Sequence, residues 1–279
     1  MGTNGPRPYL TTACRARALG DRAPGTRTDV FRAACSLGVA LVPSPGALLG
    51  YAGDSGLRAI CWASANLVPV GCDDQALAAF ATKLRRWRRQ CSSVFGPADM
   101  VLRMWEQLRP TWGEPRDVRS SQPVLATEGP RPAGLRCDRQ VRRARFTEVD
   151  LVLPAAAAMF TEEIGYPPYW GSRQVYRQSI ETLIREGRTF VRVDDGEVVF
   201  KADVGSVALG VAQIQGVWVA PRWRGHGLAG PAMAAVVEQV QAEIADVVTL
   251  YVNDFNVPAR ATYARVGFTE IGHFATVLM

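Results

Sequence analysis

The chain has 279 residues, 48% of them hydrophobic, and a formal charge of +6. This length can bury a substantial core and is compatible with one large or two ordinary domains. No apolar run reaches the roughly 18 residues of a membrane-spanning helix, and residues 1–27 are rich in Arg, Gly and Pro without the apolar core of a signal peptide. We therefore expect a cytoplasmic protein that does not associate with a membrane.

Cysteine and histidine usage argues against a metal centre and against a disulfide framework. The cysteines are Cys14, Cys35, Cys61, Cys72, Cys91 and Cys137, with no C-x-x-C pair among them. The two histidines, His226 and His273, are too few for a His-based metal site or a catalytic triad. We predict no metal, and reduced cysteines that serve mainly in packing.

The positive charge allows two interpretations. Lys and Arg could neutralise the phosphates of a nucleic acid, or they could occupy solvated helix faces. Much of the excess lies in residues 83–89 and 136–145. Near the first cluster one helical stripe is apolar, formed by Leu77, Phe80, Leu84 and Trp87. The arginines would then lie on wet faces at a helix C-terminus, where cations are favoured. We prefer this second interpretation and expect no nucleic-acid partner.

The N-terminal half predicts a small α/β domain over residues 46–130, after a poorly defined segment over residues 1–45. In chain order the patterns predict strands at 48–52, 57–62 and 67–70, a helix from Asp73 or Asp74 to Arg89, a strand at 91–95, and a helix from Ala98 to Leu108. Residues 109–121 are rich in turn formers, and residues 128–133 contain a glycine and two prolines. The domain boundary is therefore predicted near residue 130.

The pattern of the C-terminal half predicts an α+β domain over residues 138–279. In this domain helices cover one face of a mixed sheet. Its expected elements are a strand at 141–146, a helix capped near Thr147 and Asp150 that runs through Phe160, a helix at 172–185, a hairpin of strands 189–193 and 197–203, a strand at 211–219, a helix with the apolar face Ala232, Val236, Val240 and Ile244, and a strand at 247–252. Pro154 should kink or shorten the first of these helices.

The most informative stretch is Arg222-Trp223-Arg224-Gly225-His226-Gly227-Leu228-Ala229, which joins the strand at 211–219 to the following helix. Glycines at 225 and 227 allow backbone N–H groups to turn toward a ligand, and the helix N-terminus adds unpaired N–H groups and a positive dipole end. The natural ligand is an anion such as a pyrophosphate. The spacing fits neither the Walker lysine loop nor the three-glycine dinucleotide pattern, so both of those folds are disfavoured.

A second motif lies downstream, where Asn256, Ala259, Tyr263, Gly267 and Phe268 follow the strand at 247–252. Together, the loop and this Asn-x-x-Ala-x-x-x-Tyr-x-x-x-Gly-Phe pattern resemble the GNAT superfamily of N-acetyltransferases over residues 138–279. The resemblance implies the GNAT fold, a mixed and mostly antiparallel sheet flanked by helices, for the C-terminal domain.

Three shorter runs, at 159–165, 200–205 and 274–278, resemble an actinobacterial subgroup in which a domain of unknown function precedes the GNAT domain. Residues 46–126 resemble that leading domain, and its element order echoes the C-terminal half. Asp73 and Asp74 stand where its pyrophosphate loop would be, and their charge would repel an anion. We therefore expect a degenerate, non-catalytic GNAT-like half.

The resemblance implies acetyl-CoA as cosubstrate. The backbone of Val217, Trp218 and Val219 would pair with the pantetheine arm and polarise the thioester carbonyl. The other implied cofactor-binding residues are Arg222, Arg224, Gly225, His226, Gly227, Leu228, Ala229, Asn256 and Ala259. Alternatively, the two valines fit ordinary core positions of a strand and the arginines fit a solvated loop. His226 is expected to bind through its backbone rather than to act in catalysis.

The resemblance also implies Tyr263 as the general acid for the departing thiolate. A phenol pKa of about 10 against a thiol pKa of about 8.5 makes this proton transfer modestly uphill. A half-buried helix aromatic is the alternative. Glu162 and Glu163 are candidates for the base or for binding a cationic amine, with solvated helix-end acids as the alternative. The candidates for lining the acceptor pocket are Asp203, Asn253 and Tyr166.

The sequence therefore predicts an acetyl-CoA-dependent N-acetyltransferase that acts on a small-molecule or peptide amine. Direct attack in a ternary complex is expected, because no Cys, Ser-His or Lys motif marks a covalent intermediate. The alternative is a non-catalytic module that senses CoA or binds a partner through the leading domain. The sequence leaves the acceptor open and is compatible with a homodimer.

Overall fold

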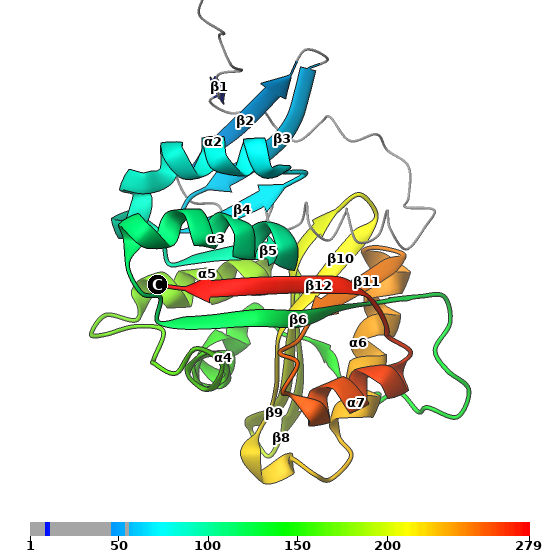
Figure 1. Ribbon diagram of the computed structural model, residues 1–279. Coiled ribbons are helices and arrows are strands. Elements are labelled where there is room, and N and C mark those ends of the chain that lie inside the picture. The colour runs from blue at the N-terminus through cyan, green and yellow to red at the C-terminus, as the bar shows by residue number, and fades with distance from the viewer. Residues whose placement is uncertain (1–8, 12–45, 54–55) are drawn as a thin grey trace, which may run out of the picture. The chain divides into compact units, whose positions relative to one another are not determined.

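The computed structural model describes residues 9–11, 46–53 and 56–279 (Figure 1). Its packing divides the chain into two compact units. Unit 1 comprises the described residues up to Val124 together with Tyr251–Phe255 and Glu270–Met279, and unit 2 comprises Leu125–Leu250 and Asn256–Thr269. Most of the segment predicted to be poorly defined, residues 1–45, lies outside the described residues.

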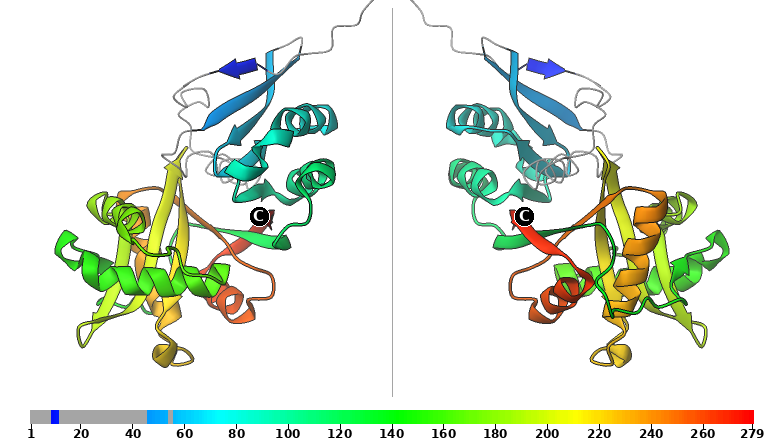
Figure 2. Two further views of the ribbon diagram at one scale, coloured as in Figure 1. Left: turned by 90° about the vertical axis from the view of Figure 1, so that its left-hand side faces the viewer. Right: turned by 90° about the vertical axis from the view of Figure 1, so that its right-hand side faces the viewer.

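Unit 1 is a sheet with two long helices that pack side by side on one face (Figure 2). Its elements are β1 (Tyr9–Thr11), β2 (Ala47–Gly53), β3 (Gly56–Ala63), β4 (Asn66–Val70), α2 (Asp74–Leu84), the 3₁₀ helix η1 (Arg85–Gln90), β5 (Ser93–Pro97), α3 (Ala98–Trp112) and most of β6 (Asp117–Glu128) and β12 (Thr269–Leu278). The strand order is β1-β2-β3-β4-β5-β12-β6. β4 and β5 are parallel, with α2 as the crossover between them.

The last strand of the chain belongs to the sheet of unit 1. β12 runs antiparallel to β5, with Phe274 opposite Pro97 and Leu278 opposite Ser93. Ala275 and Val277 of this strand are fully buried in the core under α2 and α3. Unit 1 is therefore assembled from segments far apart in the sequence, whereas the predicted domains are continuous ranges. The boundary near residue 130 stays a prediction.

Two predicted features of this half are wrong in detail. The helix expected to reach Arg89 ends at Leu84 and continues as η1. The stretch 109–121, predicted to be turn-rich, contains the last turn of α3 and the start of β6. α3 extends because Trp112 is buried and its indole Nε1 donates to the carbonyl of Arg85 at 2.9 Å. β6 forms because its second half is buried in the sheet, which outweighs weak local propensity.

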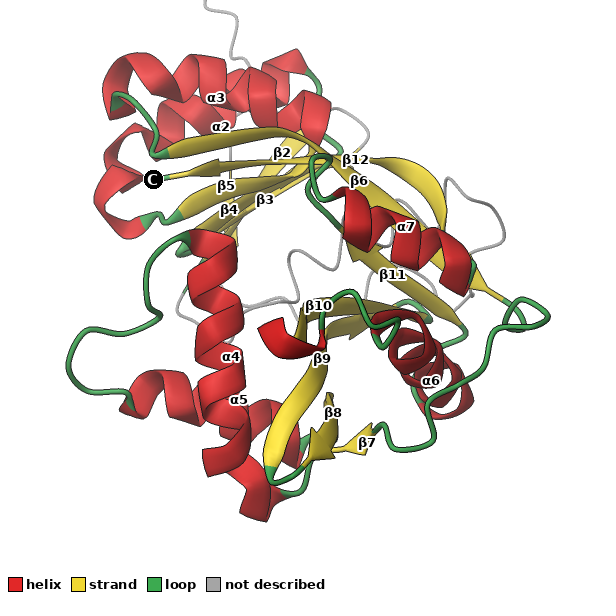
Figure 3. Ribbon diagram, turned by 90° about the horizontal axis from the view of Figure 1, so that it is seen from below, coloured by secondary structure: helices red, strands yellow, loops and turns green. Residues whose placement is uncertain are grey.

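The strands of unit 2 are neighbours in the order β11-β10-β9-β8-β7. Its elements are β7 (Arg142–Arg143), η2 (Phe146–Glu148), α4 (Val149–Ile164), α5 (Gln174–Arg185), β8 (Thr189–Asp194), β9 (Glu197–Ala208), β10 (Val211–Val219), η3 (Pro221–Trp223), α6 (Ala229–Glu243), β11 (Val247–Tyr251) and α7 (Val257–Val266). Helices α4 and α5 lie on one face of the strands and α6 on the other (Figure 3). Among the described helices, none is both long and apolar enough to cross a membrane.

The start of α4 differs from the prediction in two ways. The helix runs through Pro154 to Ile164 and is not shortened, because the neighbouring Leu153 and Ala155 are buried in the core that α4 shares with α5. Within the described residues no side chain caps α4; the backbone N–H of Arg145 instead donates to Glu148 Oε2 at 2.8 Å and caps the preceding helix η2. The strand expected at 141–146 is reduced to the two residues of β7.

Candidate active site

The central strand β10 is bulged and leaves its neighbour. Its pairing with β9 is shifted twice, between Gln213 and Ile214 and between Gln215 and Trp218. Gly216 lies in the second shift with φ +59°, a left-handed conformation that favours glycine. Within the described chain, parallel pairing with β11 covers 211–213 only. The other edge of 217–219 is therefore outside the ladder, and its backbone groups can pair with an extended ligand.

The loop after β10 presents an open helix N-terminus. Gly225 and Gly227 have φ values of +77° and +75°, and a Cβ atom at either position would meet nothing within 4 Å. α6 begins at Ala229, and in the described structure no side chain caps it. Its first backbone N–H groups therefore keep the hydrogen-bonding capacity and the positive dipole end that bind anions.

The two loop arginines are engaged in ion pairs with exposed carboxylates. Arg222 lies 2.6 Å from Glu197. Arg224 lies 2.7 Å from Glu162 Oε2 and donates from Nε to the carbonyl of Val219 at 2.9 Å. Ion pairs of this exposure contribute only about 0–1 kcal/mol, so a phosphate can displace either carboxylate. His226 Nδ1 contacts the carbonyl of Arg224 at 2.9 Å, which holds its ring on the loop.

Glu162 connects three elements of the site. Its Oε2 binds Arg224, and its Oε1 accepts from the indole Nε1 of Trp218 at 3.2 Å. This carboxylate on α4 therefore holds both the end of β10 and the loop that follows. Both oxygens are occupied in this structure, and the role of Glu162 as base or as binder of a cationic amine stays a prediction.

Tyr263 lies on α7, within electrostatic reach of Glu163 on α4. The Tyr263 side chain is buried and packs edge-on against Phe268, with ring centroids 5.9 Å apart. Burial, followed by the negative charge of Glu163, raises the pKa of the Tyr263 phenol above its ordinary value. The phenol is therefore a weaker acid than a free one and stays protonated, as a hydrogen-bond donor must.

Asn256 and Ala259 act together at the start of α7. The Asn256 side-chain oxygen accepts from the backbone N–H of Ala259 at 3.2 Å and caps the helix. Gly267 ends the helix in the left-handed conformation with φ +103°. Both ends of α7 are thus fixed by residues of the downstream motif, which places Tyr263 between them.

The three acceptor candidates lie in different surroundings. Tyr166 is half-exposed and stands edge-on to Phe160, with centroids 5.9 Å apart. Asp203 is buried on β9, where it binds Thr189 and Lys201. Asn253 belongs to unit 1, where its side-chain oxygen accepts from Gln122 Nε2 at 2.9 Å. The structure therefore groups Tyr166 and Asp203 in unit 2, and Asn253 serves a network of unit 1.

Lys201 is a residue of this region that the sequence reasoning missed. Its side chain is 0% exposed, and its Nζ donates to Asp203 Oδ2, whose other oxygen accepts from Thr189 Oγ1 at 2.8 Å. Composition carried a signal for it, because Lys83 and Lys201 are the only lysines among 32 Lys and Arg residues.

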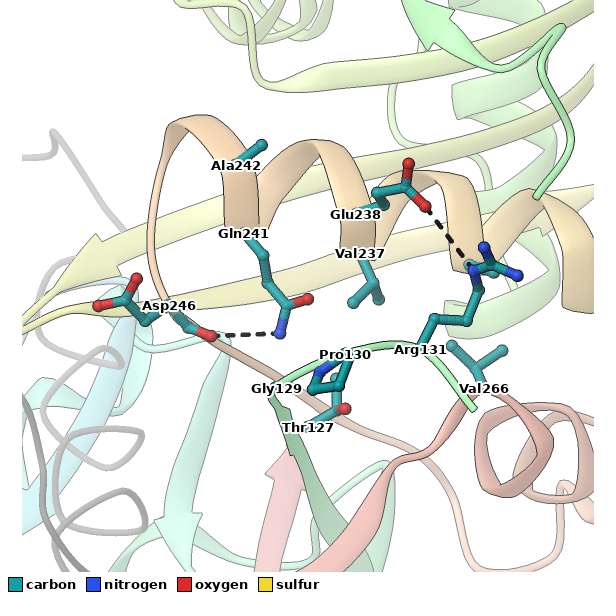
Figure 4. Close-up of a pocket in the computed structure, with 11 residues that line it drawn as sticks. Thr127, Gly129, Pro130, Arg131, Val237, Glu238, Gln241, Ala242, Asp246 and Val266 are labelled. Atoms are coloured by element: carbon teal, nitrogen blue, oxygen red, sulfur yellow. Dashed lines mark hydrogen bonds and ion pairs between the residues drawn. The ribbon is translucent and has the colours of Figure 1, made fainter. Parts of the chain in front are cut away.

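A cavity of about 590 Å³ lies elsewhere in unit 2, along α6 (Figure 4). The segment 127–131 forms its other wall, and Arg131 faces Glu238 across it at 3.7 Å. Gln241 is occupied by the carbonyl of Asp246 at 3.2 Å. None of the predicted site residues lines this cavity.

Comparison with known proteins agrees with this architecture. Residues 46–152 match the model of DUF4081, a domain of unknown function, and residues 156–268 match the model of the acetyltransferase (GNAT) family. No curated protein matches the chain. Residues 46–152 are thus similar to DUF4081 and residues 156–268 to the GNAT acetyltransferases, and the predicted fold class, an α+β chain with a C-terminal GNAT fold, is confirmed. The actinobacterial subgroup stays a prediction.

Solved structures share the fold over nearly the whole chain. An acetyltransferase of the GNAT family from Colwellia psychrerythraea has a TM-score of 0.56 at 13% identity and covers 91% of this chain and 97% of its own. A GCN5-related N-acetyltransferase from Sphaerobacter thermophilus has a TM-score of 0.55 at 18% identity, with coverages of 91% and 93%. A Drosophila protein reaches 0.58 at 12% identity and covers 99% of both chains.

Proposed function

We propose that the protein is an acetyl-CoA-dependent N-acetyltransferase whose cofactor site lies in unit 2. The observation that carries this proposal is the uncapped N-terminus of α6 behind Gly225 and Gly227, directly after a strand whose edge is outside the ladder. A diphosphate fits the first feature, and an arm that contains amide groups fits the second. Coenzyme A combines both chemical groups in one molecule.

The loop arginines would exchange partners when the cofactor binds. Arg222 and Arg224 are held by exposed carboxylates that a diphosphate can replace, since the phosphate carries more charge and also meets the α6 amides. The pantetheine arm would pair with the backbone of Val217, Trp218 and Val219, at the edge that lies outside the ladder with β11. Gly225, His226, Gly227, Leu228 and Ala229 would contribute their backbone.

The chemical step would use Tyr263 and Glu163. An amine attacks the thioester carbonyl directly, and Tyr263 donates to the sulfur as the thiolate departs. Glu163, whose charge acts on that phenol, would take the proton of the attacking amine through water. In the free protein Glu162 would hold the loop, because Trp218 and Arg224 occupy its two carboxylate oxygens.

The acceptor would be a small-molecule or peptide amine that approaches from the side of α4 and α5. Aromatic rings gather there: Phe160 lies edge-on to both Tyr166 and Tyr176, and Tyr169 lies 5.9 Å from Tyr176. Trp170, in the loop between the two helices, is 81% exposed. Aromatic faces bind cationic groups and apolar groups alike, so they suit an amine with a carbon skeleton.

The test has two stages. Calorimetry of the full chain with acetyl-CoA should show saturable binding, and free-thiol release should then be measured across a panel of amino acids, polyamines, aromatic amines and peptides. Tyr263→Phe should lower the turnover number while leaving acetyl-CoA affinity unchanged. Absence of acetyl-CoA binding by folded protein would contradict the proposal. Binding without thiol release on any amine would favour the non-catalytic CoA-sensing module instead.

A further inference from the structure

The buried ion pair of Lys201 and Asp203 is the unusual feature of the unit 2 core. Among the described residues, Lys201 and Asp203 are the only charged residues that are buried. Burying two charges has a desolvation cost that their attraction often fails to recover, and apolar replacements of similar volume are commonly neutral or stabilising. Stability alone therefore gives no reason to keep this pair.

The pair lies directly beneath the bulge of β10. In the register of β9 against β10, Lys201 lies opposite Trp218 and Asp203 lies opposite Gln215. The two charged residues therefore flank the extra residue that the bulge inserts into β10. A Cβ atom at Gly216 would lie 3.1 Å from Asp203 Oδ2 and 3.3 Å from Lys201 Nζ. The glycine therefore leaves both charged groups next to the backbone of the bulge.

The remaining neighbour of this position is movable. The methyl group of Met159 lies 3.1 Å from the same Cβ position. Met159 and Gly216 are both partly exposed, and a methionine side chain has three rotatable bonds. A group that binds at the bulge can therefore displace this methyl and reach the buried pair.

Lys201 has hydrogen-bonding capacity to spare. An ammonium group has three N–H donors. The hydrogen bond to Asp203 uses one of them, and Lys201 forms no second hydrogen bond within the described residues. Asp203 is held from its other side by Thr189 at 2.8 Å. The carboxylate thus fixes the ammonium group in place, while donors remain available for an oxygen atom of a ligand.

We propose that Lys201 is a catalytic hydrogen-bond donor to the thioester carbonyl oxygen and that Asp203 is its positioning residue. This inference rests on the function proposed above, in which the acyl group is held at the bulge. Oxygen gains negative charge there as the amine attacks, and a fixed ammonium group in a water-poor site stabilises that charge most effectively.

The bond changes balance without a further reactant. The amine lone pair forms the N–C bond, and the carbonyl π pair moves to the oxygen that faces Lys201, which keeps its proton throughout. When the pair returns, the C–S bond breaks and the sulfur takes the proton of Tyr263. The nitrogen gives its extra proton to Glu163, and that proton restores the phenol. The products are the amide and free coenzyme A.

The first experiment removes both charges together. Lys201→Met with Asp203→Asn keeps the volumes and leaves no unpaired buried charge, so unfolding free energy should be close to that of the wild type. We expect acetyl-CoA affinity to stay within about threefold and the turnover number to fall about 100- to 1,000-fold, the usual effect of losing an oxyanion donor. Lys83→Met, at the exposed second lysine, is the matched control and should change neither. A folded double variant with a turnover number within about threefold of the wild type would overturn the proposal.

A second experiment uses the wild-type protein, so it tests the proposal even if the double variant does not fold. With ¹⁵N-labelled lysine, the chain contains two labelled side chains, and the exposed Lys83 ammonium exchanges its protons rapidly with water. Acetyl-CoA should shift the Lys201 ammonium signal, whereas coenzyme A, which has no thioester carbonyl, should not. Identical signals with both ligands would overturn the assignment. If the wild-type protein binds acetyl-CoA and releases thiol in the same samples, the proposed function holds even when the Lys201 assignment is wrong. The two proposals are therefore tested separately.

Discussion

Gly227→Ala isolates the contribution of the loop conformation to cofactor binding. Gly227 has φ +75°, and a Cβ atom there would meet nothing within 4 Å. The substitution therefore introduces no clash, and its cost is purely conformational. For an alanine in the left-handed region this cost is about 1–2 kcal/mol.

That cost must appear in one of two measurements. If the loop keeps its turn, the free energy of unfolding falls by about 1–2 kcal/mol and affinity is unchanged. If the loop relaxes in the free protein, the free energy of unfolding is unchanged. Binding must then restore the turn, which raises the dissociation constant for acetyl-CoA about 5- to 30-fold. We expect the second outcome, because nothing packs against the position of the added methyl.

Gly196→Ala is the matched control. Gly196 has φ +74° and equally open surroundings, but it lies in the hairpin between β8 and β9, where the flanking ladder fixes the turn. Its cost should therefore appear as lost stability with unchanged acetyl-CoA affinity. The measurements are calorimetric titration and chemical unfolding of both variants. If Gly227→Ala lowers neither stability nor affinity, the loop does not require the left-handed turn, and the reasoning is refuted.

Three further predictions concern ionisable groups. The raised pKa of Tyr263 keeps its phenol protonated, so the pH profile of turnover should show no alkaline decline assigned to it up to about pH 10, and a decline that Tyr263→Phe abolishes would contradict this. Glu162→Gln releases Arg224 from its ion pair and should tighten acetyl-CoA binding up to about fivefold, most at low salt; calorimetry that shows weaker binding would instead make Glu162 part of the binding-competent loop. Arg142, hydrogen-bonded to Glu148, lowers the pKa of that carboxyl from 4.5, so its contribution to stability is present above pH 4.5 and is lost as the pH falls below it; chemical unfolding of Glu148→Gln should lack this part of the acid dependence, and an unchanged dependence would exclude it.

The loop and the downstream motif could be predicted because their information is local. Two glycines after an apolar strand and before a helix determine a turn with exposed amides, and the structure has that turn at Gly225 and Gly227. The Asn256 cap and the helix end at Gly267 were not predicted, but they obey equally local rules. The roles of these residues toward a cofactor are still predictions, which the experiments above address.

Long-range pairing could not be predicted in this way. The β12 strand has the same alternation whether it pairs with a strand of its own half or with β5, and only the burial of Ala275 and Val277 under α2 and α3 distinguishes the two. For the same reason no local pattern in the sequence indicated the hydrogen bond between Gln122 and Asn253, and the place of Asn253 in an acceptor pocket stays a prediction. Lys201 is a different case, because the composition already shows that lysine is rare in this arginine-rich chain. That rarity could have marked Lys201 as a candidate site residue.

The two units use a similar helix terminus in opposite ways. In each, a strand leads through a glycine with positive φ into a helix that crosses to a parallel strand: β4, α2 and β5 in unit 1, and β10, α6 and β11 in unit 2. In unit 1 the carboxylate of Asp73 accepts the Ala76 N–H at 2.9 Å and also binds Arg58 at 2.7 Å, so the terminus is already supplied with a negative charge from the chain itself. In unit 2 no described side chain takes that place. Since a diphosphate would have to displace a covalently attached carboxylate at α2 but not at α6, the difference favours one bound cofactor per chain.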